Sequence, residues 1–279
     1  MSRRASARPF SMAGYVLVVA VCLPFVLPLI WMLMGAGKTT QEFLADPWSL
    51  PTDFQWHNFA EAWVVGQIGQ YTLNSLFVTT VTLLGVACLG FPMAYAIARI
   101  RFTGHRLLLG VFAASLFIPI QIFVVSLFDL ESQLGLIDTS WAMILPYIAT
   151  NLPFTVLFLT AFLRAVPVEI EDAATLDGAS RFAIMTRIML PLSRPAFATV
   201  IVFTFLGVWN EFIIAYTVTH SDAVRTLPVG LLNFSQQFGQ TDYPRLFAAL
   251  SLSAIPIFAV FLIGQRQFMR GLTEGAVKL

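Results

Sequence analysis

The residue types that most often carry out catalysis or bind metals are scattered in this sequence. The three histidines, His57, His105 and His220, fall in three separate polar segments, so they suggest neither a zinc site nor a histidine-based catalytic pair. The two cysteines, Cys22 and Cys88, lie inside apolar runs and offer no disulfide framework. The sequence therefore predicts no catalytic residue and no metal site.

One short stretch, GAGKTT at residues 35–40, imitates a phosphate-binding loop. That motif requires a glycine five residues before Gly37, and Met32 stands at this position. We therefore expect no nucleotide or other cofactor to bind this chain. If ATP drives the protein, another subunit must bind it.

The composition is that of a membrane protein. Hydrophobic residues make up 58% of the chain and charged residues only 11%, whereas soluble domains carry roughly 25% charged residues. The net charge of +1 and the absence of a basic run give no reason to expect nucleic acid as a partner. The apolar run from Ser11 to Met34 is too long for a secretory signal and is predicted to be the first span.

Six stretches are long and apolar enough to cross a bilayer, which takes about 20 residues. They are residues 12–34, 73–97, 107–128, 142–163, 196–218 and 246–264. With the N-terminus inside, all basic residues except Lys38, Arg225 and Arg245 fall in inner segments, as expected from the cytoplasmic preference of Lys and Arg. The sequence thus predicts an all-α integral membrane protein with six transmembrane helices and both termini in the cytoplasm.

A polar insert, residues 164–195, separates the fourth and fifth predicted spans. Pro167 suits the first turn of a helix. Three acidic residues follow near the positive helix end, where they are favourable: Glu169, Glu171 and Asp172. Four residues are predicted by their spacing to share one helix face: Ile170, Ala173, Ala174 and Asp177. The two alanines would let another surface approach this helix closely.

The second half of the insert predicts another short helix. Gly178 is expected to stop the first helix in a left-handed conformation, and Ser180 to cap the second. The second helix should run through Ile188, and Pro191 should prevent it from continuing beyond Leu190. We expect a helix–glycine–helix elbow at the cytoplasmic surface, which by itself is either a docking device or a solvated linker.

The spacing within the elbow resembles the E-A-A loop of binding-protein-dependent ABC importer permeases. Asp172-Ala173-Ala174 is followed by three residues, Gly178, nine residues, and Ile188-x-Leu190-Pro191. The resemblance implies a type I ABC importer permease fold in which this loop forms a coupling helix that sits in a groove of a cytoplasmic ATPase. The residues implied in ATPase coupling are Glu171, Asp172, Ala173, Ala174, Gly178, Ile188, Leu190 and Pro191. The family's glutamate is Asp172 here, with Glu171 beside it, which alters the polar contact but not the docking.

Three further stretches resemble the carbohydrate branch of this family, in particular its maltose-system G-type permeases. They are GQRQFMRGLTEGAVKL at residues 264–279, WNEF at Trp209–Phe212, and Asn74–Ser75. The implied protein is a permease subunit of a sugar or oligosaccharide importer in the prokaryotic plasma (inner) membrane. Its implied partners are a second permease, two ATPase subunits that bind ATP and Mg, and an extracytoplasmic sugar-binding protein.

The resemblance divides the chain into five segments. These are a cytoplasmic N-terminus (1–11), a first transmembrane helix (12–34), an extracytoplasmic loop (35–69), a transmembrane core (70–265) that includes the coupling loop 164–195, and a cytoplasmic tail (266–279).

Polar side chains inside spans are candidates for the translocation path. Glu211 lies roughly 22 Å from Ala196 at the inner edge, counted at 1.5 Å per residue. The candidate path residues are Gln121, Asn151, Trp209, Asn210 and Glu211, which offer hydrogen bonds and an aromatic face to a sugar. The alternative is that Glu211 pairs with a partner helix or a backbone group.

Two other functions remain open at this point. An ion-coupled secondary transporter could use Glu211 as its proton-linked carboxylate, and would leave the elbow without a purpose. An ABC permease for a non-sugar solute, such as phosphate or an amino acid, would keep the elbow. Only the carbohydrate-type stretches favour a sugar over other solutes.

Overall fold

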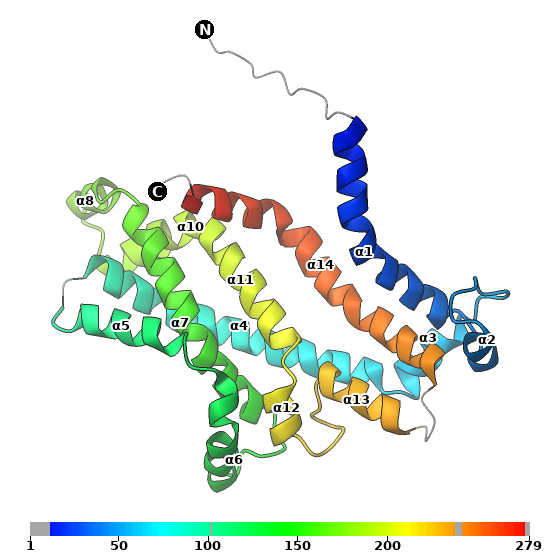
Figure 1. Cartoon of the computed structure of the whole chain (residues 1–279). Coiled ribbons are helices and arrows are strands. Elements are labelled where there is room, and N and C mark those ends of the chain that lie inside the picture. The colour runs from blue at the N-terminus through cyan, green and yellow to red at the C-terminus, as the bar shows by residue number, and fades with distance from the viewer. Residues whose placement is uncertain (1–11, 101, 238–241, 277–279) are drawn as a thin grey trace. The chain divides into compact units, whose positions relative to one another are not determined.

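The computed structural model describes residues 12–100, 102–237 and 242–276, and within these ranges the chain is helical with no β-strand (Figure 1). The long helices are α1 (Met12–Ala36), α4 (Ile68–Arg99), α7 (Trp141–Ala165), α11 (Arg194–Trp209) and α14 (Tyr243–Ala276). The shorter ones outside the elbow are α2 (Thr40–Ala45), α3 (His57–Val64), α5 (His105–Ser115), the 3-10 helix η1 (Ile120–Phe123), α6 (Val124–Gln133), α12 (Ile213–Val218) and α13 (Leu227–Gln237). The predicted all-α class is confirmed.

Among the described residues, four helices are long and apolar enough to cross a membrane, and two bent pairs raise the number to six if each pair counts as one span. The four are α1, α4, α7 and the first part of α14. The bent pairs are His105–Ser115 with Ile120–Gln133, at 91°, and Arg181–Leu192 with Arg194–Trp209, at 73°. Five basic residues used to predict the orientation lie outside the described residues: Arg3, Arg4, Arg8, Arg101 and Lys278.

The predicted span 107–128 is not one straight helix. Helix α5 ends at Ser115, and Pro119 then adopts an extended conformation (φ −65°, ψ 131°) before η1 and α6. Proline disfavours a helical conformation in the residue before it, so the chain turns between the two helices. The predicted span 196–218 is likewise divided, because α11 ends at Trp209 and α12 begins at Ile213.

The first of two compact units comprises residues 1–66 and 234–252, and aromatic rings form part of its interior. The ring centroid of Trp31 in α1 lies 5.0 Å from that of Phe247 in α14 and 6.0 Å from that of Phe43 in α2. The rings of Phe43 and Phe247 lie 5.4 Å apart. The indole N–H of Trp31 also donates to the carbonyl of Pro47 at 3.0 Å.

The GAGKTT stretch belongs to this unit, and its lysine is structural. Lys38 is fully buried, and its amine donates to the carbonyl of Asp46 (2.7 Å) and the hydroxyl of Ser49 (3.0 Å). The amide of Asn58 donates to the carbonyls of Ala36 and Lys38. These bonds hold the turn after α1, and they occupy the amine that a phosphate-binding loop would need free.

The second unit comprises residues 67–233 and 253–279, and helix α4 packs along α7 within it. At Gly90 of α4, an added Cβ would lie 2.7 Å from the Thr155 methyl group of α7, so only glycine fits. Small residues permit such close approaches between membrane helices. One buried cluster joins α4, α7 and α11 to the elbow, and another joins α4 and α7 to α12 and α13.

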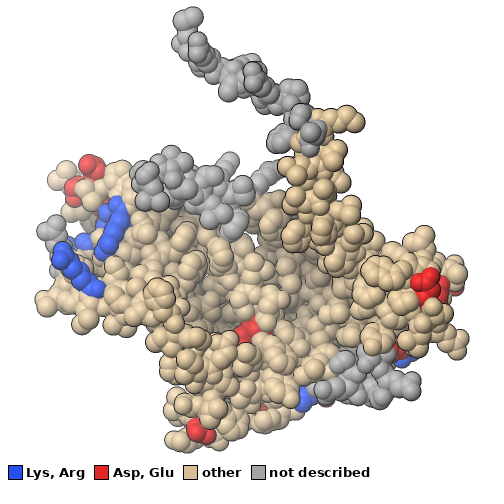
Figure 2. All heavy atoms as spheres, in the orientation of Figure 1, with Lys and Arg blue, Asp and Glu red and all other residues tan. Residues whose placement is uncertain are grey.

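Charged side chains of this second unit gather at its two ends in the view of Figure 2. Blue and red spheres collect over α5 and α8 at one end, and over α6 and the connection after α12 at the other. Apart from one red patch near the centre, the visible surface between these ends is uncharged, as expected for the part of a protein that lies in lipid.

We predict that Gly230→Ala destabilises the protein whereas Gly110→Ala does not. A Cβ at Gly230 would lie 2.0 Å from the ring of Tyr71, which is buried and has little room to move. A Cβ at Gly110 of α5 would have no atom within 4 Å. Overpacking of this kind costs about 1–3 kcal/mol, which the thermal unfolding midpoint in detergent would report. Equal midpoints for the two variants would contradict this account.

Candidate functional site

Helix α8 (Glu169–Leu176) forms the first half of the elbow. Gly178 follows it with φ at +81°, and the N–H of Ala179 closes the turn on the carbonyl of Ala174 at 3.0 Å. The predicted left-handed stop is confirmed. An added Cβ at Gly178 would meet nothing within 4 Å, so the backbone angle, rather than lack of space, requires glycine here.

The second half of the elbow contains α9 (Arg181–Ala183), the π-helical turn η2 (Ile184–Met189) and α10 (Leu190–Leu192). The predicted cap is confirmed, because the Ser180 hydroxyl accepts from the N–H of Ala183 at 3.3 Å. The prediction that Pro191 ends the helix at Leu190 is wrong. The wider π turn leaves Pro191 in the first turn of α10, where its missing N–H does no harm.

The two alanines of the elbow face in different directions, contrary to the shared face expected from their spacing. Ala174 is buried in a cluster of side chains from α4, α7 and η2, whereas Ala173 is exposed together with Asp177. Ile188 packs against the same cluster. One side of α8 is therefore fixed to the body of the second unit, and the other is open.

The open side of the elbow carries large apolar side chains. Leu176 is 90% exposed and Phe182 is 72% exposed, on either side of Gly178. Asp172 is also exposed, and within the described part of the chain its carboxylate makes no hydrogen bond or ion pair. Exposed apolar residues ringed by polar ones are typical of a protein-binding surface.

Glu171 faces inward, and its partners were not predicted from the sequence. Its carboxylate forms an ion pair with Arg99 (Nε to Oε1, 2.6 Å) and accepts from the hydroxyl of Tyr95 at 2.9 Å. Arg99 also donates to the carbonyl of Val166 at 2.7 Å. Tyr95 and Arg99 are one turn apart near the end of α4, and that spacing is the only local sign of their shared role.

Glu211 lies in the break between α11 and α12, where it caps α12. Its two carboxylate oxygens accept from the backbone N–H groups of Ile214 (2.9 Å) and Ala215 (3.2 Å). The hydroxyl of Tyr147 donates to the same carboxylate. The structure thus shows the backbone pairing that the sequence analysis gave as the alternative to a sugar contact.

The other candidate path residues are only partly brought together. Asn151 lies one turn after Tyr147 on α7 and donates to its carbonyl at 2.8 Å. Trp209 is buried and stacks on Phe205, whereas Asn210 is exposed and donates to the carbonyl of Leu206. Gln121 is exposed on η1.

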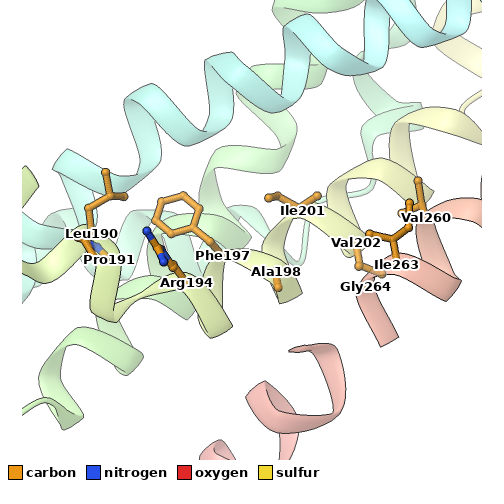
Figure 3. Close-up of a pocket in the computed structure, with 10 residues that line it drawn as sticks. All are labelled: Leu190, Pro191, Arg194, Phe197, Ala198, Ile201, Val202, Val260, Ile263 and Gly264. Carbon is orange, nitrogen blue, oxygen red and sulfur yellow. The ribbon is translucent and has the colours of Figure 1, made fainter. Parts of the chain in front are cut away.

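A pocket of about 630 Å³ lies between α10–α11 and α14 in the second unit (Figure 3). Its lining is apolar apart from Arg194: Leu190, Pro191, Arg194, Phe197, Ala198, Ile201, Val202, Val260, Ile263 and Gly264. In Figure 3 Leu190, Pro191 and Arg194 lie toward one end of the pocket, and Val260, Ile263 and Gly264 lie toward the other. Leu190 and Pro191 of the elbow contribute to it, but none of the candidate path residues does, so it lacks the several polar groups that hold a sugar.

The loop between α12 and α13, residues 219–226, is held by hydrogen bonds to Asn74, Ser75 and Asp138, which are called the clamp below. Asp138 accepts from the N–H groups of His220 (2.8 Å) and Ser221 (2.9 Å). From α4, Asn74 donates to the carbonyls of Ala223 and Arg225, and the Ser75 hydroxyl accepts from the N–H of Leu227 at 2.8 Å. The Asn74–Ser75 pair therefore has a structural role in holding this loop.

An elbow fixed on one side and open on the other, attached to several bilayer-length helices, defines a multi-pass membrane protein with a polar insert between its spans. The model of the family described as "Binding-protein-dependent transport system inner membrane component" matches residues 87–274. The chain belongs to this family, and it is a multi-pass inner-membrane protein.

Curated relatives and a solved structure agree with this assignment. The chain is 35% identical to the diacetylchitobiose uptake system permease protein NgcG of Streptomyces coelicolor, over 98% of this chain and 91% of that protein. It is 32% identical to the trehalose/maltose transport system permease protein MalG of Thermococcus litoralis, over 95% of each. A bacterial ABC transporter involved in the import of the acidic polysaccharide alginate has a chain of the same fold, with a TM-score of 0.78 and 19% identity, covering 94% of this chain and 100% of that one.

We predict that Glu211→Gln lowers stability and leaves uptake per folded protein close to that of the wild type. The amide nitrogen would present a donor to one of the two N–H groups from which the carboxylate now accepts, which costs about 1–3 kcal/mol. Asn210→Ala is the matched control, because this exposed neighbour should change stability little. Thermal unfolding and solute uptake into vesicles measure the two effects. Loss of uptake without loss of stability in Glu211→Gln would assign Glu211 to the path instead.

We predict that the clamp weakens in acid. Hydrogen bonds from the backbone N–H groups of Ser221 and His220 lower the pKa of Asp138 below its ordinary value of 3.8. Because the pKa is lowered by folding, its contribution to stability is present above pH 4 and is lost as the pH falls through the folded-state pKa. The variant for comparison is Asp138→Asn, because asparagine tolerates the positive φ of 62° at this position but does not ionise.

The difference in unfolding midpoint between the wild type and Asp138→Asn should therefore be largest near pH 6 and shrink toward pH 3. A difference that stays constant over this range would show that the ionised carboxylate does not hold the loop.

Proposed function

We propose that this chain is one of the two transmembrane subunits of an ATP-driven importer for a sugar or oligosaccharide. Family membership supports a role as a transport subunit rather than an enzyme. The named relatives carry diacetylchitobiose and trehalose or maltose, and the match extends over at least 91% of each of them. A small saccharide is therefore the solute class that these relatives favour, ahead of phosphate or an amino acid.

The elbow is the element that couples this chain to an ATPase. The observation that carries this proposal is the two-sidedness of α8, with Ala174 buried against the helices and Leu176 and Phe182 exposed. A partner that grips the exposed side pulls on helices to which the buried side is fixed. In this proposal ATP and Mg bind to two ATPase subunits, and their closure moves the elbow.

The orientation follows from the same proposal. The elbow faces the cytoplasm and both termini lie on that side. Each bent pair contributes one span, the second through α11 alone because its first half belongs to the elbow, which gives six. The clamped loop after α12 then lies on the outer side, where an extracytoplasmic sugar-binding protein docks. The family description supports such a partner, because it refers to binding-protein-dependent transport.

The translocation path is shared with a second permease. The pocket between α10–α11 and α14 is nearly all apolar, and none of the candidate path residues lines it. A sugar needs several hydrogen-bonding groups around it, so the second subunit supplies part of the lining. Glu211 already has three donors within the chain, which leaves the ion-coupled alternative with little support.

We predict that Gly178→Val abolishes coupling while the protein still inserts into the membrane. Valine strongly disfavours the left-handed angle of +81°, so the orientation of Leu176 relative to Phe182 should change. Gly135→Val is the matched control, because Gly135 also has a positive φ (67°) and open space around it but lies between α6 and α7.

The measurement uses the complete reconstituted importer. ATP hydrolysis stimulated by the loaded binding protein, and sugar uptake, should fall to background in Gly178→Val and persist in Gly135→Val. If stimulated hydrolysis in Gly178→Val equals that of the wild type, the elbow is not the coupling element. Uptake by the purified chain alone would overturn the proposed function altogether.

A further inference from the structure

The ion pair between Arg99 and Glu171 connects the elbow to a helix that is distant from it in the sequence. We infer that these two residues are positioning residues that transmit movement of α8 to α4, and that contact with the ATPase is left to Asp172 and its exposed neighbours. This inference rests on the proposed function. It adds a residue outside the elbow, Arg99, to the coupling machinery, and it separates the roles of two adjacent carboxylates.

The pair is shielded from water and has further partners. The side chains of Arg99 and Glu171 are only 10% and 15% exposed, and their charged groups lie 2.6 Å apart. Both oxygens of Glu171 are engaged, one by Arg99 and the other by Tyr95. A shielded pair of this kind is screened far less than a surface ion pair, and loss of one partner leaves a buried charge uncompensated.

The connection changes which helices move with the elbow. Val166 lies in the backbone between α7 and α8. Arg99, at the end of α4, donates to the carbonyl of Val166 at 2.7 Å. Tyr95 and Arg99 contact Glu171 from successive turns of α4. Because α8 is attached to α4 at two points, rotation of α8 relative to α4 is resisted. A force on α8 therefore reaches two membrane-spanning helices together instead of α7 alone.

Asp172 cannot share this role, because consecutive residues of a helix point about 100° apart. Glu171 faces α4, whereas Asp172 is exposed and has no partner within the described part of the chain. Since both oxygens of Glu171 are occupied, its side chain does not replace the shorter Asp172 in contacting another subunit.

The test compares four variants in the complete importer: Glu171→Gln, Arg99→Gln, the charge exchange Arg99→Glu with Glu171→Arg, and Asp172→Asn as the matched control. Three quantities are measured, namely retention of the ATPase on purification through this chain, basal ATP hydrolysis, and hydrolysis stimulated by the loaded binding protein. Retention and basal hydrolysis report docking, and the ratio of stimulated to basal hydrolysis reports transmission.

Glu171→Gln and Arg99→Gln should retain the ATPase and its basal hydrolysis but lower the stimulated-to-basal ratio by roughly 2- to 30-fold, the range of measured coupling effects. The charge exchange should recover part of the ratio. Asp172→Asn should instead weaken retention of the ATPase. If either single variant fails to insert, Tyr95→Phe, which removes only one donor to Glu171, should lower the ratio by a smaller factor.

Three outcomes would overturn the inference. The first is a wild-type ratio of stimulated to basal hydrolysis in Glu171→Gln and Arg99→Gln while Gly178→Val is uncoupled. Tyr95→Phe replaces these two variants in the comparison if they fail to insert. The proposed function would then stand without a role for the Arg99–Glu171 pair. The second is loss of the ATPase in Glu171→Gln, which would mean direct contact. The third is a wild-type ratio in every variant, Gly178→Val included, which would remove the proposed coupling function as well.

Discussion

The constraint on which this structure depends is that a polar group in an apolar chain must find its partner within the protein. Water is absent from the hydrocarbon region, so each unpaired donor or acceptor there costs several kcal/mol. The break between α11 and α12 illustrates this. Ending α11 at Trp209 frees the N–H groups at the start of α12, and the carboxylate of Glu211 accepts two of them. The helix can be broken here because a side chain two residues past the end of α11 accepts from these freed N–H groups.

The same constraint shapes the elbow. Its acidic turn is too polar for lipid, yet one of its carboxylates is nearly as shielded as a core residue, and only the guanidinium of Arg99 and the hydroxyl of Tyr95 make that possible. The polar insert is thereby joined to the membrane helices by charge as well as by the apolar contact of Ala174. In the proposed function, attachment on one face and exposure on the other allow a soluble partner to act on helices in the bilayer.

Features encoded by neighbouring residues were predictable from the sequence, and features that depend on distant residues were not. The all-helical class follows from hydropathy, and the turn at Gly178 and the cap at Ser180 follow from local backbone chemistry. The continuation through Pro191 was missed because it depends on a π turn that no local residue type signals. Arg99 lies 72 positions before Glu171, and helical spacing cannot reveal a pair that forms only when α4 packs along α7.

The direction of each carboxylate also bears on how the E-A-A spacing tolerates aspartate at its first position. A side chain that must reach back to α4 needs the length of glutamate, since one of its oxygens pairs with the charge of Arg99 and the other accepts from Tyr95, one turn away on that helix. Asp172 bears no such requirement, because it is exposed and makes no hydrogen bond or ion pair within the described part of the chain. Shortening the outward carboxylate therefore breaks no bond within the described part of the chain, whereas shortening the inward one would remove its contacts with Arg99 and Tyr95 of α4. The longer residue, Glu171, therefore stands at the position from which the side chain must extend to α4.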